Sequence, residues 1–323
     1  MEWRRPADRL DIRLGGDRFC TMLPVALVSG VLRKARAPQY TPEMLTRMGE
    51  DSVGKQRLNG TELTSTQRTS RSNKPDMSKK VIADASPPDP KQNRILAALP
   101  ARDYERLLPN LELVEMPLGW TMSESGDHVN YLHFPTSGIV SLMYSLEDGS
   151  SSETALVGDE GMVGISIFMG GESMPTSTEV QSAGHAYRLS RKVMKQEFAL
   201  GGELQHVALL FTQALICQTS QTAVCNQHHS LDQQLCRWLL MSMDRLHSDE
   251  VVITQKTIGE LLGVRRESVT QVVGQLQKDG LLVRTRGRIT VLDRPKLEKR
   301  VCECYAVVKD EYERLLPHGR SSK

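Results

Sequence analysis

The feature that most constrains this fold is the segment Ile253–Leu276, in which two helical patterns meet at a glycine. Thr254 suits the N-cap of a first helix. Gly263 suits the left-handed turn that would end it. The apolar positions that we expect to be buried recur at helical spacing: Ile258, Leu261, Leu262, Val269, Val272, Val273 and Leu276. Two helices joined by so short a turn predict a helix-turn-helix.

Two β-rich runs follow the second helix. Leu281–Thr285 and Arg288–Leu292 are joined by Arg286 and Gly287, which predicts a hairpin with cations at its tip. Between positions 251 and 300, eleven Lys and Arg outnumber five Asp and Glu, a net charge of +6, whereas positions 90 to 200 carry −6. A polyanion would be attracted to the first segment and repelled by the second. Motif, hairpin and charge together predict a winged helix-turn-helix that binds double-stranded DNA.

Polar residues at the start of the second helix could read bases: Arg265, Arg266, Glu267, Ser268, Thr270 and Gln271. Arginine can bond guanine O6 and N7 together, glutamate can accept from cytosine N4, and glutamine can pair with adenine. In the hairpin, Arg284, Arg286 and Arg288 are placed to meet phosphates. The alternative is a solvated helix surface with an ordinary charge mix, and the basic hairpin beside it favours DNA.

The rest of the chain divides by pattern. Residues 1–76 are rich in Arg, Ser, Thr, Gly and Pro, and we expect either disorder or an over-extended reading frame ahead of Met77. Positions 91–116 predict short helices, and positions 117–190 predict short strands with glycine turns, typical of a small barrel or sandwich. A long helix is expected over 203–226, and Ser230 begins another. The first carries an apolar stripe that could pack on its own barrel or on a twin helix: Leu204, Val207, Phe211, Leu215 and Thr222.

The cysteines, at positions 20, 217, 225, 236, 302 and 304, form no CxxC pair and lack the spacing of a zinc site. We therefore expect no metal, no cofactor and reduced, mostly buried thiols, with redox sensing by Cys302 and Cys304 as the alternative. Histidines are expected at the surface or in the core, with His228 and His229 in a polar hinge. We expect no apolar run long enough to cross a bilayer, which favours a cytoplasmic protein.

These features together resemble the Crp/Fnr (cyclic AMP receptor protein/FNR) family of bacterial transcription regulators over about 90–300. The resemblance implies an α+β fold with a cyclic-nucleotide-binding-like β-roll sensor domain (90–200) and a long dimerisation helix (201–228). A winged helix-turn-helix (229–298) and a C-terminal tail (299–323) would follow. It also implies a homodimer on a pseudo-palindromic site, with half-sites about 34 Å apart, and we expect RNA polymerase as a further partner.

The resemblance also assigns roles to residues. An Arg-Glu pair opens the family's recognition helix and a third polar residue follows one turn later, which implies base contacts by Arg266, Glu267 and Gln271. The third is commonly arginine in the family, so Gln271 implies a different base preference. The phosphate-contacting positions carry over onto Thr254, Lys256, Arg265, Ser268 and Arg288.

The sensor domain departs from the family's pattern. Members that bind cyclic nucleotides carry Gly-Glu for the ribose and an arginine for the cyclic phosphate, and the matching stretches here are Val163–Gly164 and Met174–Pro175. Without the arginine a bidentate contact is lost, so we expect a small-molecule effector other than cyclic AMP, at residues the sequence does not reveal. Only Cys20 lies where the oxygen-sensing branch has its iron–sulfur cysteines.

Two alternatives to an effector-gated regulator stay open. One is a sensor-silent DNA-binding protein whose β-roll is only structural. The other is a cyclic-nucleotide-type regulatory module attached to an enzyme or a partner protein. The basic hairpin counts against the second, and with no catalytic constellation in the sequence we expect no enzyme.

Overall fold

The computed structural model of the protein describes residues 87–316, and the expectation for residues 1–76 lies outside them. Short helical segments precede the first strand, because Pro100 and Pro109 cannot continue a helix that reaches them. The segments are η1 (Pro90–Gln92), α2 (Arg94–Ala98), α3 (Ala101–Leu107) and η2 (Leu108–Asn110). The side chain of Asn93 caps α2 and donates to the backbone oxygens of Pro135 and Gly161, which ties these helices to the strands that follow.

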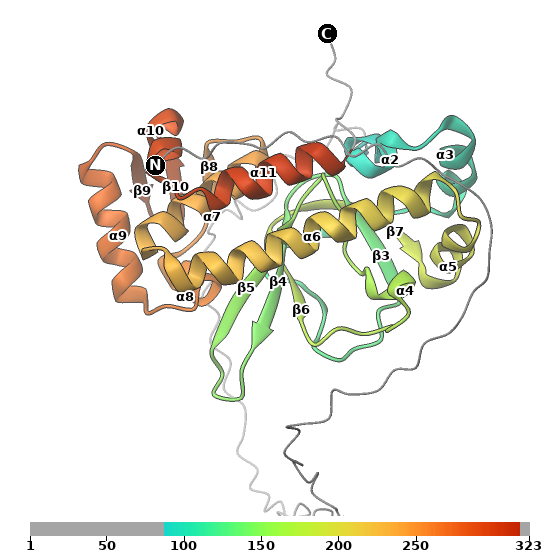
Figure 1. Ribbon diagram of the computed structural model, residues 1–323, viewed down its shortest axis with the longest axis horizontal. Helices are drawn as coiled ribbons and strands as arrows, with labels where there is room; N and C mark the ends of the chain where they lie inside the picture. Colours follow the sequence, from blue (N-terminus) through green and yellow to red (C-terminus); the bar gives the residue numbers. More distant parts are fainter. Residues whose placement is uncertain (1–86, 317–323) are drawn as a thin grey trace, which may run out of the picture. The chain divides into compact units, whose positions relative to one another are not determined.

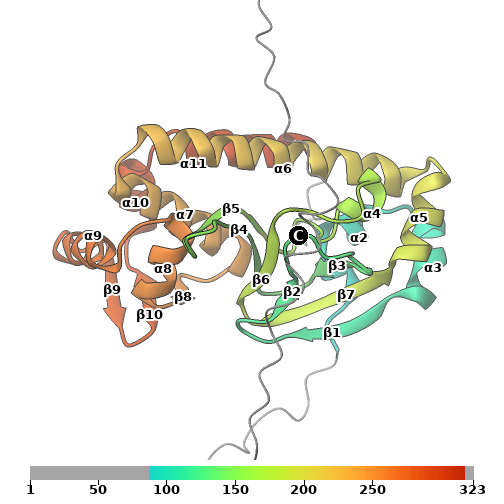
Figure 2. The same ribbon diagram turned by 90° about the horizontal axis from the view of Figure 1, so that it is seen from below.

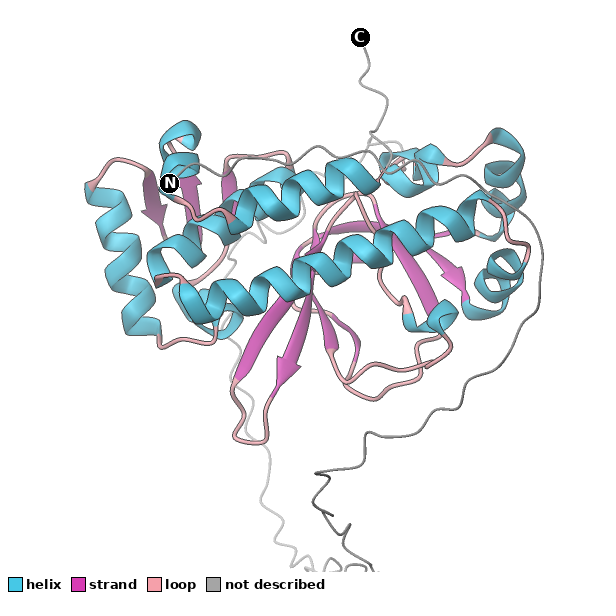
Figure 3. Ribbon diagram, in the orientation of Figure 1, coloured by secondary structure: helices cyan, strands magenta, loops and turns pink. Residues whose placement is uncertain are grey.

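Two antiparallel sheets form the β-roll between Glu112 and Ser190, in the strand orders β1-β7-β3 and β2-β6-β4-β5 (labelled in Figures 1 and 2, magenta in Figure 3). The strands are β1 (Glu112–Met116), β2 (Thr121–Ser123), β3 (Tyr131–Pro135), β4 (Ile139–Ser145), β5 (Ser151–Val157), β6 (Ser177–Ser182) and β7 (Gly184–Ser190). Their inward side chains, among them Leu132, Phe134, Leu156 and Leu189, are fully buried and form the core of the roll. The predicted β-roll is confirmed.

A long helix leaves the roll. After α4 (Ser166–Met169) and α5 (Arg191–Ala199), helix α6 (Glu203–His228) runs past the sheets towards the C-terminal helices (Figures 1 and 2). The predicted apolar stripe of α6, from Leu204 to Leu215, is buried within its own chain. The stripe therefore packs on its own β-roll, and a different face of α6 stays exposed.

Helix α6 also corrects one expectation from the sequence. Among the described residues it is the one helix whose length and composition would allow it to cross a membrane. Gln, Ser and Thr interrupt its apolar run and make it look too polar, although none of these residues carries a charge. A core helix meets the same criterion, and the buried stripe gives α6 that place in this fold.

The C-terminal domain begins with α7 (Leu231–Leu246), where Ser230 and Gln233 form a capping box. Its other elements are β8 (Glu250–Val252), α8 (Gln255–Leu262), α9 (Arg266–Lys278), β9 (Leu282–Thr285), β10 (Arg288–Val291) and α10 (Arg294–Arg300). The three strands make one antiparallel sheet in the order β8-β10-β9. Helix, turn, helix and β-hairpin therefore follow one another as the sequence predicts.

The segment expected to be a tail, 299–323, instead contains a helix, α11 (Cys304–Leu315). It packs along α6, and Figure 2 shows the two helices beside each other. The side chains of Tyr305, Val308, Tyr312 and Leu315 are buried at helical spacing. The same periodic pattern is present in the sequence of this segment.

Buried polar contacts join the β-roll to the C-terminal domain. Arg245 of α7 donates to Glu160, with an Nε–Oε1 distance of 2.7 Å, and both side chains are buried. Trp238 of α7 donates to Glu153 of β5 at 3.1 Å, and Ser141 donates to the same carboxylate at 2.5 Å. Complete burial raises the pKa of Glu153 from 4.5 to about 7.

The raised pKa makes a testable prediction about stability. The folded chain holds the Glu153 proton up to about pH 7, whereas the unfolded chain releases it near pH 4.5. The free energy of unfolding of the wild type, relative to Glu153→Gln, should therefore fall as pH rises through this window, by up to roughly 3 kcal/mol. Urea titrations of both proteins at several pH values measure this difference, in which the contributions of other groups cancel.

Glu147→Gln is the matched control, since Glu147 is exposed in the turn after β4. Its stability difference should show no trend across the same pH range. A pH-independent difference for Glu153→Gln would mean that this carboxyl titrates normally in the folded protein.

Candidate nucleic-acid interface

The helix-turn-helix is fixed by local hydrogen bonds. The Thr254 hydroxyl accepts from the backbone N–H of Thr257 at 3.1 Å and so caps α8. Gly263 ends α8 with a φ of 65°, in the left-handed region that favours glycine. Both features agree with the sequence analysis. Arg265, in an extended conformation, then serves as the N-cap of α9 without a side-chain cap bond.

A second glycine brings the turn close to α8. The backbone N–H of Val264 donates to the carbonyl of Gly259 at 2.8 Å. A Cβ on Gly259 would lie 2.8 Å from the Val264 oxygen, closer than real Cβ contacts allow. Gly259 therefore lets the turn fold back on α8, which sets the angle at which α9 leaves.

Helix α9 separates a buried face from an exposed one. Val269, Val273 and Leu276 are buried, as predicted, while Val272 is only half-buried. The three side chains expected to read bases, Arg266, Glu267 and Gln271, are all exposed. The recognition face is therefore open to a ligand.

One contact on this face was not predicted. Thr270 donates to the side-chain oxygen of Gln255 at 3.0 Å, which links the exposed face of α9 to the first turn of α8. Thr270 is one of the predicted base readers, but its hydroxyl oxygen also lies 2.9 Å from the Arg266 carbonyl oxygen, so its one hydrogen atom serves either of two acceptors. Its hydrogen atom is thus already engaged within the motif.

Strands β9 and β10 form the wing, with Arg286 and Gly287 at the turn. An open groove of about 670 Å³ lies between the wing and the helices α8 and α9. Its lining includes Lys256 and Arg266 from the helices, and Arg284 and Arg286 from the wing. The structure thus gathers cations from two separated parts of the sequence around one concave surface.

Ion pairing differs across the domain. Arg265, Arg266, Arg284 and Arg286 form no ion pair with any residue between 87 and 316. By contrast, Arg294 pairs with Asp244 and Arg300 pairs with Asp232. Four arginines without an acidic partner among residues 87–316 therefore lie at the start of the recognition helix and in the wing.

Two other predicted phosphate contacts have intramolecular partners. Arg288 of β10 pairs with Glu250 of β8, with 2.5 Å between Nη1 and Oε1. Lys256 pairs with Glu260 one turn along α8 at 3.2 Å, and its side chain is 77% exposed. Exposed pairs of this kind are weak, so a phosphate could compete with the carboxylate for either cation.

The β-roll encloses a mostly apolar cavity of about 180 Å³ beside α6. Its lining includes Val163, Gly164 and Met174, the stretches that correspond to the family's cyclic nucleotide site. The charged side chains in the lining are Glu124 and Asp127, with no Lys or Arg among the described residues there. Such a lining disfavours an anionic phosphate.

Trp120 lies outside this cavity, edge-on to His133, with 6.2 Å between the ring centroids.

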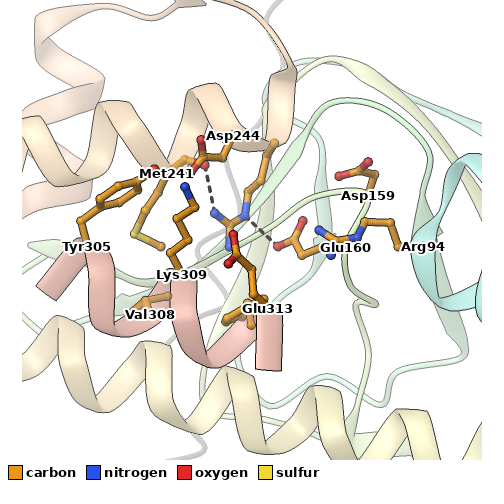
Figure 4. Close-up of a pocket in the computed structure, with 11 residues that line it drawn as sticks. Arg94, Asp159, Glu160, Met241, Asp244, Tyr305, Val308, Lys309 and Glu313 are labelled. Carbon is orange, nitrogen blue, oxygen red and sulfur yellow. Dashed lines mark hydrogen bonds and ion pairs between the residues drawn. The ribbon is translucent and has the colours of Figure 1, made fainter. Parts of the chain in front are cut away.

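A second crevice, of about 230 Å³, lies where the roll meets the C-terminal helices. Figure 4 shows Asp159 and Glu160 facing Asp244 of α7 and Lys309 of α11 across it. The buried pair between Glu160 and Arg245 lies at this crevice. Acidic and basic side chains are mixed along its walls, so it is a polar boundary between the β-roll and the C-terminal helices.

Two family models match the chain. Residues 114–199 match the cyclic nucleotide-binding domain, and residues 233–300 match the Crp-like helix-turn-helix domain. The chain has the two domains of a Crp/Fnr-type transcription regulator. The predicted resemblance and fold class are thereby confirmed, whereas the predicted domain boundaries and site residues stay predictions.

Solved structures share the fold of this regulator. A protein from Eubacterium rectale described as a transcriptional regulator of the Crp/Fnr family has 19% identity and a TM-score of 0.53, covering 65% of this chain and 98% of its own. The c-di-GMP responsive global regulator CLP of Xanthomonas campestris has 17% identity and a TM-score of 0.51, covering 60% and 100%. FixK2 from Bradyrhizobium japonicum has 15% identity and a TM-score of 0.53, covering 59% and 98%. No curated protein matches the sequence of this chain.

The two helical glycines of the motif predict opposite effects on stability. Gly259→Ala should destabilise this regulator by more than about 1 kcal/mol, because the new Cβ would clash with the Val264 carbonyl. Gly274→Ala in α9 meets nothing within 4 Å and should stabilise it by roughly 0.5–1 kcal/mol. Thermal and urea unfolding measure both changes. Equal effects of the two substitutions would contradict the close turn.

Proposed function

We propose that this regulator binds double-stranded DNA sequence-specifically through α9 and the wing. The observation that carries the proposal is the groove between them, where Arg266, Arg284 and Arg286 lack ion-pair partners among residues 87–316. A row of phosphates would supply the missing negative charge and would form charge-assisted hydrogen bonds.

Base reading is assigned to Arg266, Glu267 and Gln271, which are exposed at the start of α9. Each good bidentate contact discriminates between bases by about 1–3 kcal/mol. Phosphate contacts are assigned to Thr254, Lys256, Arg265, Ser268, Arg284, Arg286 and Arg288. The exposed pair between Arg288 and Glu250 is weak enough for a phosphate to take the place of that carboxylate.

We further propose that the protein binds a pseudo-palindromic operator as a homodimer through α6. One row of exposed residues on α6 alternates in spacings of three and four, the repeat of a coiled-coil seam: Leu209, Gln213, Ile216, Ser220, Ala223 and Gln227. Leu209 and Ile216 are 48% and 59% exposed, so a twin helix would bury apolar surface there.

The cavity beside α6 is the proposed effector site, for a small molecule other than cyclic AMP. It is mostly apolar, and its charged side chains are acidic, which suits an uncharged or cationic ligand better than a phosphate. Thr212, Leu215 and Ile216 of α6 line it, so a ligand would contact the helix that carries the seam. A cytoplasmic location, contact with RNA polymerase and the absence of enzymatic activity complete the proposal.

The sensor-silent protein, whose β-roll is only structural, is the second candidate. The cavity favours an effector over this candidate, because a roll with only a structural role needs no internal space. A DNA affinity that no small-molecule fraction changes would favour the silent protein. The third reading, a regulatory module of an enzyme, does not account for the Crp-like helix-turn-helix domain at residues 233–300.

Substitution of two arginines should separate base reading from phosphate binding. Arg266→Ala should weaken binding to the best operator, selected from random duplexes, by about 1–3 kcal/mol and relax one base position. Arg286→Ala should weaken operator and random duplex alike and reduce the salt slope by about one. Fluorescence anisotropy at several salt concentrations measures both.

Cyclic AMP is added to the same titrations at a concentration that would saturate a typical cyclic-AMP-binding protein of this fold. It should leave the affinity of this protein for the operator unchanged. A wild-type protein that binds its selected duplex no better than random DNA would contradict the proposed function. An increase in affinity with cyclic AMP would contradict only the proposed effector class.

The dimer is tested on the α6 seam. Ile216→Glu places a carboxylate in the proposed interface and should raise the dimer dissociation constant roughly 30-fold or more. Sedimentation velocity over a concentration series measures this constant. Leu118→Glu is the control, because Leu118 is 60% exposed on the roll and lies outside the seam. Equal dissociation of both variants, or of neither, would exclude the seam as the dimer interface.

A further inference from the structure

Four potential metal ligands lie together at the C-terminal end of α6. Cys225 is in the last turn of α6, His229 caps that helix, and Cys302 and Cys304 flank the turn between α10 and α11. Their sulfur and nitrogen atoms all lie within 4.8 Å of one another. The two ligand pairs come from segments more than 70 residues apart, which is why the spacing along the sequence did not reveal them.

The distances suit a single metal ion. Cys225 Sγ lies 3.6 Å from Cys302 Sγ, and Cys304 Sγ lies 3.3 Å from His229 Nδ1. A tetrahedral Zn²⁺ with ordinary bond lengths would separate two thiolates by about 3.8 Å and a thiolate from an imidazole nitrogen by about 3.6 Å. The sulfurs are too far apart for a disulfide, whose length is about 2.05 Å.

The surroundings are those of a closed site. Cys225 and Cys304 are fully buried and Cys302 nearly so, and the three thiols form an apolar cluster apart from the main core. On the other side of the imidazole, His229 Nε2 lies 3.4 Å from the Glu303 carboxylate. A carboxylate on the second nitrogen commonly orients a metal-binding histidine and fixes its tautomer.

Two further polar groups fit a thiolate site. Gln221 Nε2 lies 3.0 Å from Cys304 Sγ and can donate a hydrogen bond to a thiolate. Arg237 is buried, and its Nε has no hydrogen-bond partner among the described residues. Three thiolates around a divalent ion leave one negative charge, which a buried guanidinium on α7 would offset.

We propose that Cys225, His229, Cys302 and Cys304 bind one Zn²⁺ ion. The set of three cysteines and one histidine, all supplied by the protein, is typical of a structural zinc site and leaves no position for a substrate. Binding replaces the protons of three thiols, which pass to solvent, and involves no electron transfer. This inference replaces the expectation, drawn from spacing alone, that the chain holds no metal.

The ion would join α6 to the segment that follows the wing. One ligand pair ends α6, and the other begins α11, directly after α10 of the winged domain. Zinc would therefore fix the wing-bearing domain against the long helix. Its effect on DNA affinity rests on the proposed function, whereas zinc binding itself does not.

The test uses the full chain, purified under reducing conditions. Zinc content by mass spectrometry should be about one per chain, and Co²⁺ in place of zinc should give the intense visible bands of tetrahedral thiolate coordination. Cys304→Ser and His229→Gln should each weaken zinc affinity at least 10-fold in competition with a chromophoric chelator. Cys217 is a thiol of the same helix outside the cluster, so Cys217→Ser should bind zinc like the wild type.

Several results would overturn the proposal. The proposal is wrong if the reduced wild-type protein keeps no zinc and gives no cobalt bands. It is also wrong if Cys217→Ser loses as much affinity for zinc as Cys304→Ser. A Cys225–Cys302 disulfide in metal-free protein would replace the metal site by a redox pair. His229→Gln keeps the three buried thiols, so its circular dichroism shows whether lost affinity reflects the ligand or the fold. Loss of DNA binding with zinc still bound would count against the proposed function alone.

Discussion

The contact on which the arrangement of this protein depends is the buried pair between Glu160 and Arg245. A charge removed from water is strongly disfavoured unless an opposite charge and hydrogen bonds replace the solvent. Glu160 follows strand β5 of the roll and Arg245 lies near the end of α7, so neither is satisfied unless the two parts of the chain meet in one geometry. Glu153 and Trp238 add a second buried hydrogen bond between the same two parts of the chain. Apolar packing alone would tolerate sliding, whereas these pairs do not.

Features specified by neighbouring residues could be predicted from the sequence. The cap at Thr254, the left-handed Gly263 and the helix start at Ser230 each depend on residues within four positions, and all three occur as expected. The hairpin of the wing is local in the same sense. The candidate site could therefore be located to within a turn of helix before its geometry was known, although the bases it would read could not.

Features specified by distant contacts could not be predicted in this way. The apolar stripe of α6 predicted burial but not the surface that covers it, since a twin helix and the roll would hide the same residues. Helix α11 was missed because a short amphipathic segment after a predicted domain end looks like a tail until its partner is known. The cysteine and histidine cluster required the same information, because its two halves meet only when α11 lies along α6.

Ile216 belongs to two surfaces at once. It lines the cavity of the roll and lies in the exposed row of α6 that would face a second copy. In a dimer built on that row, a molecule filling one cavity would press on a side chain that also packs against the neighbouring subunit. The two cavities would then not fill independently. The packing of Ile216 that the ligand favours would decide whether the response to rising effector concentration is steeper or shallower than that of a single site.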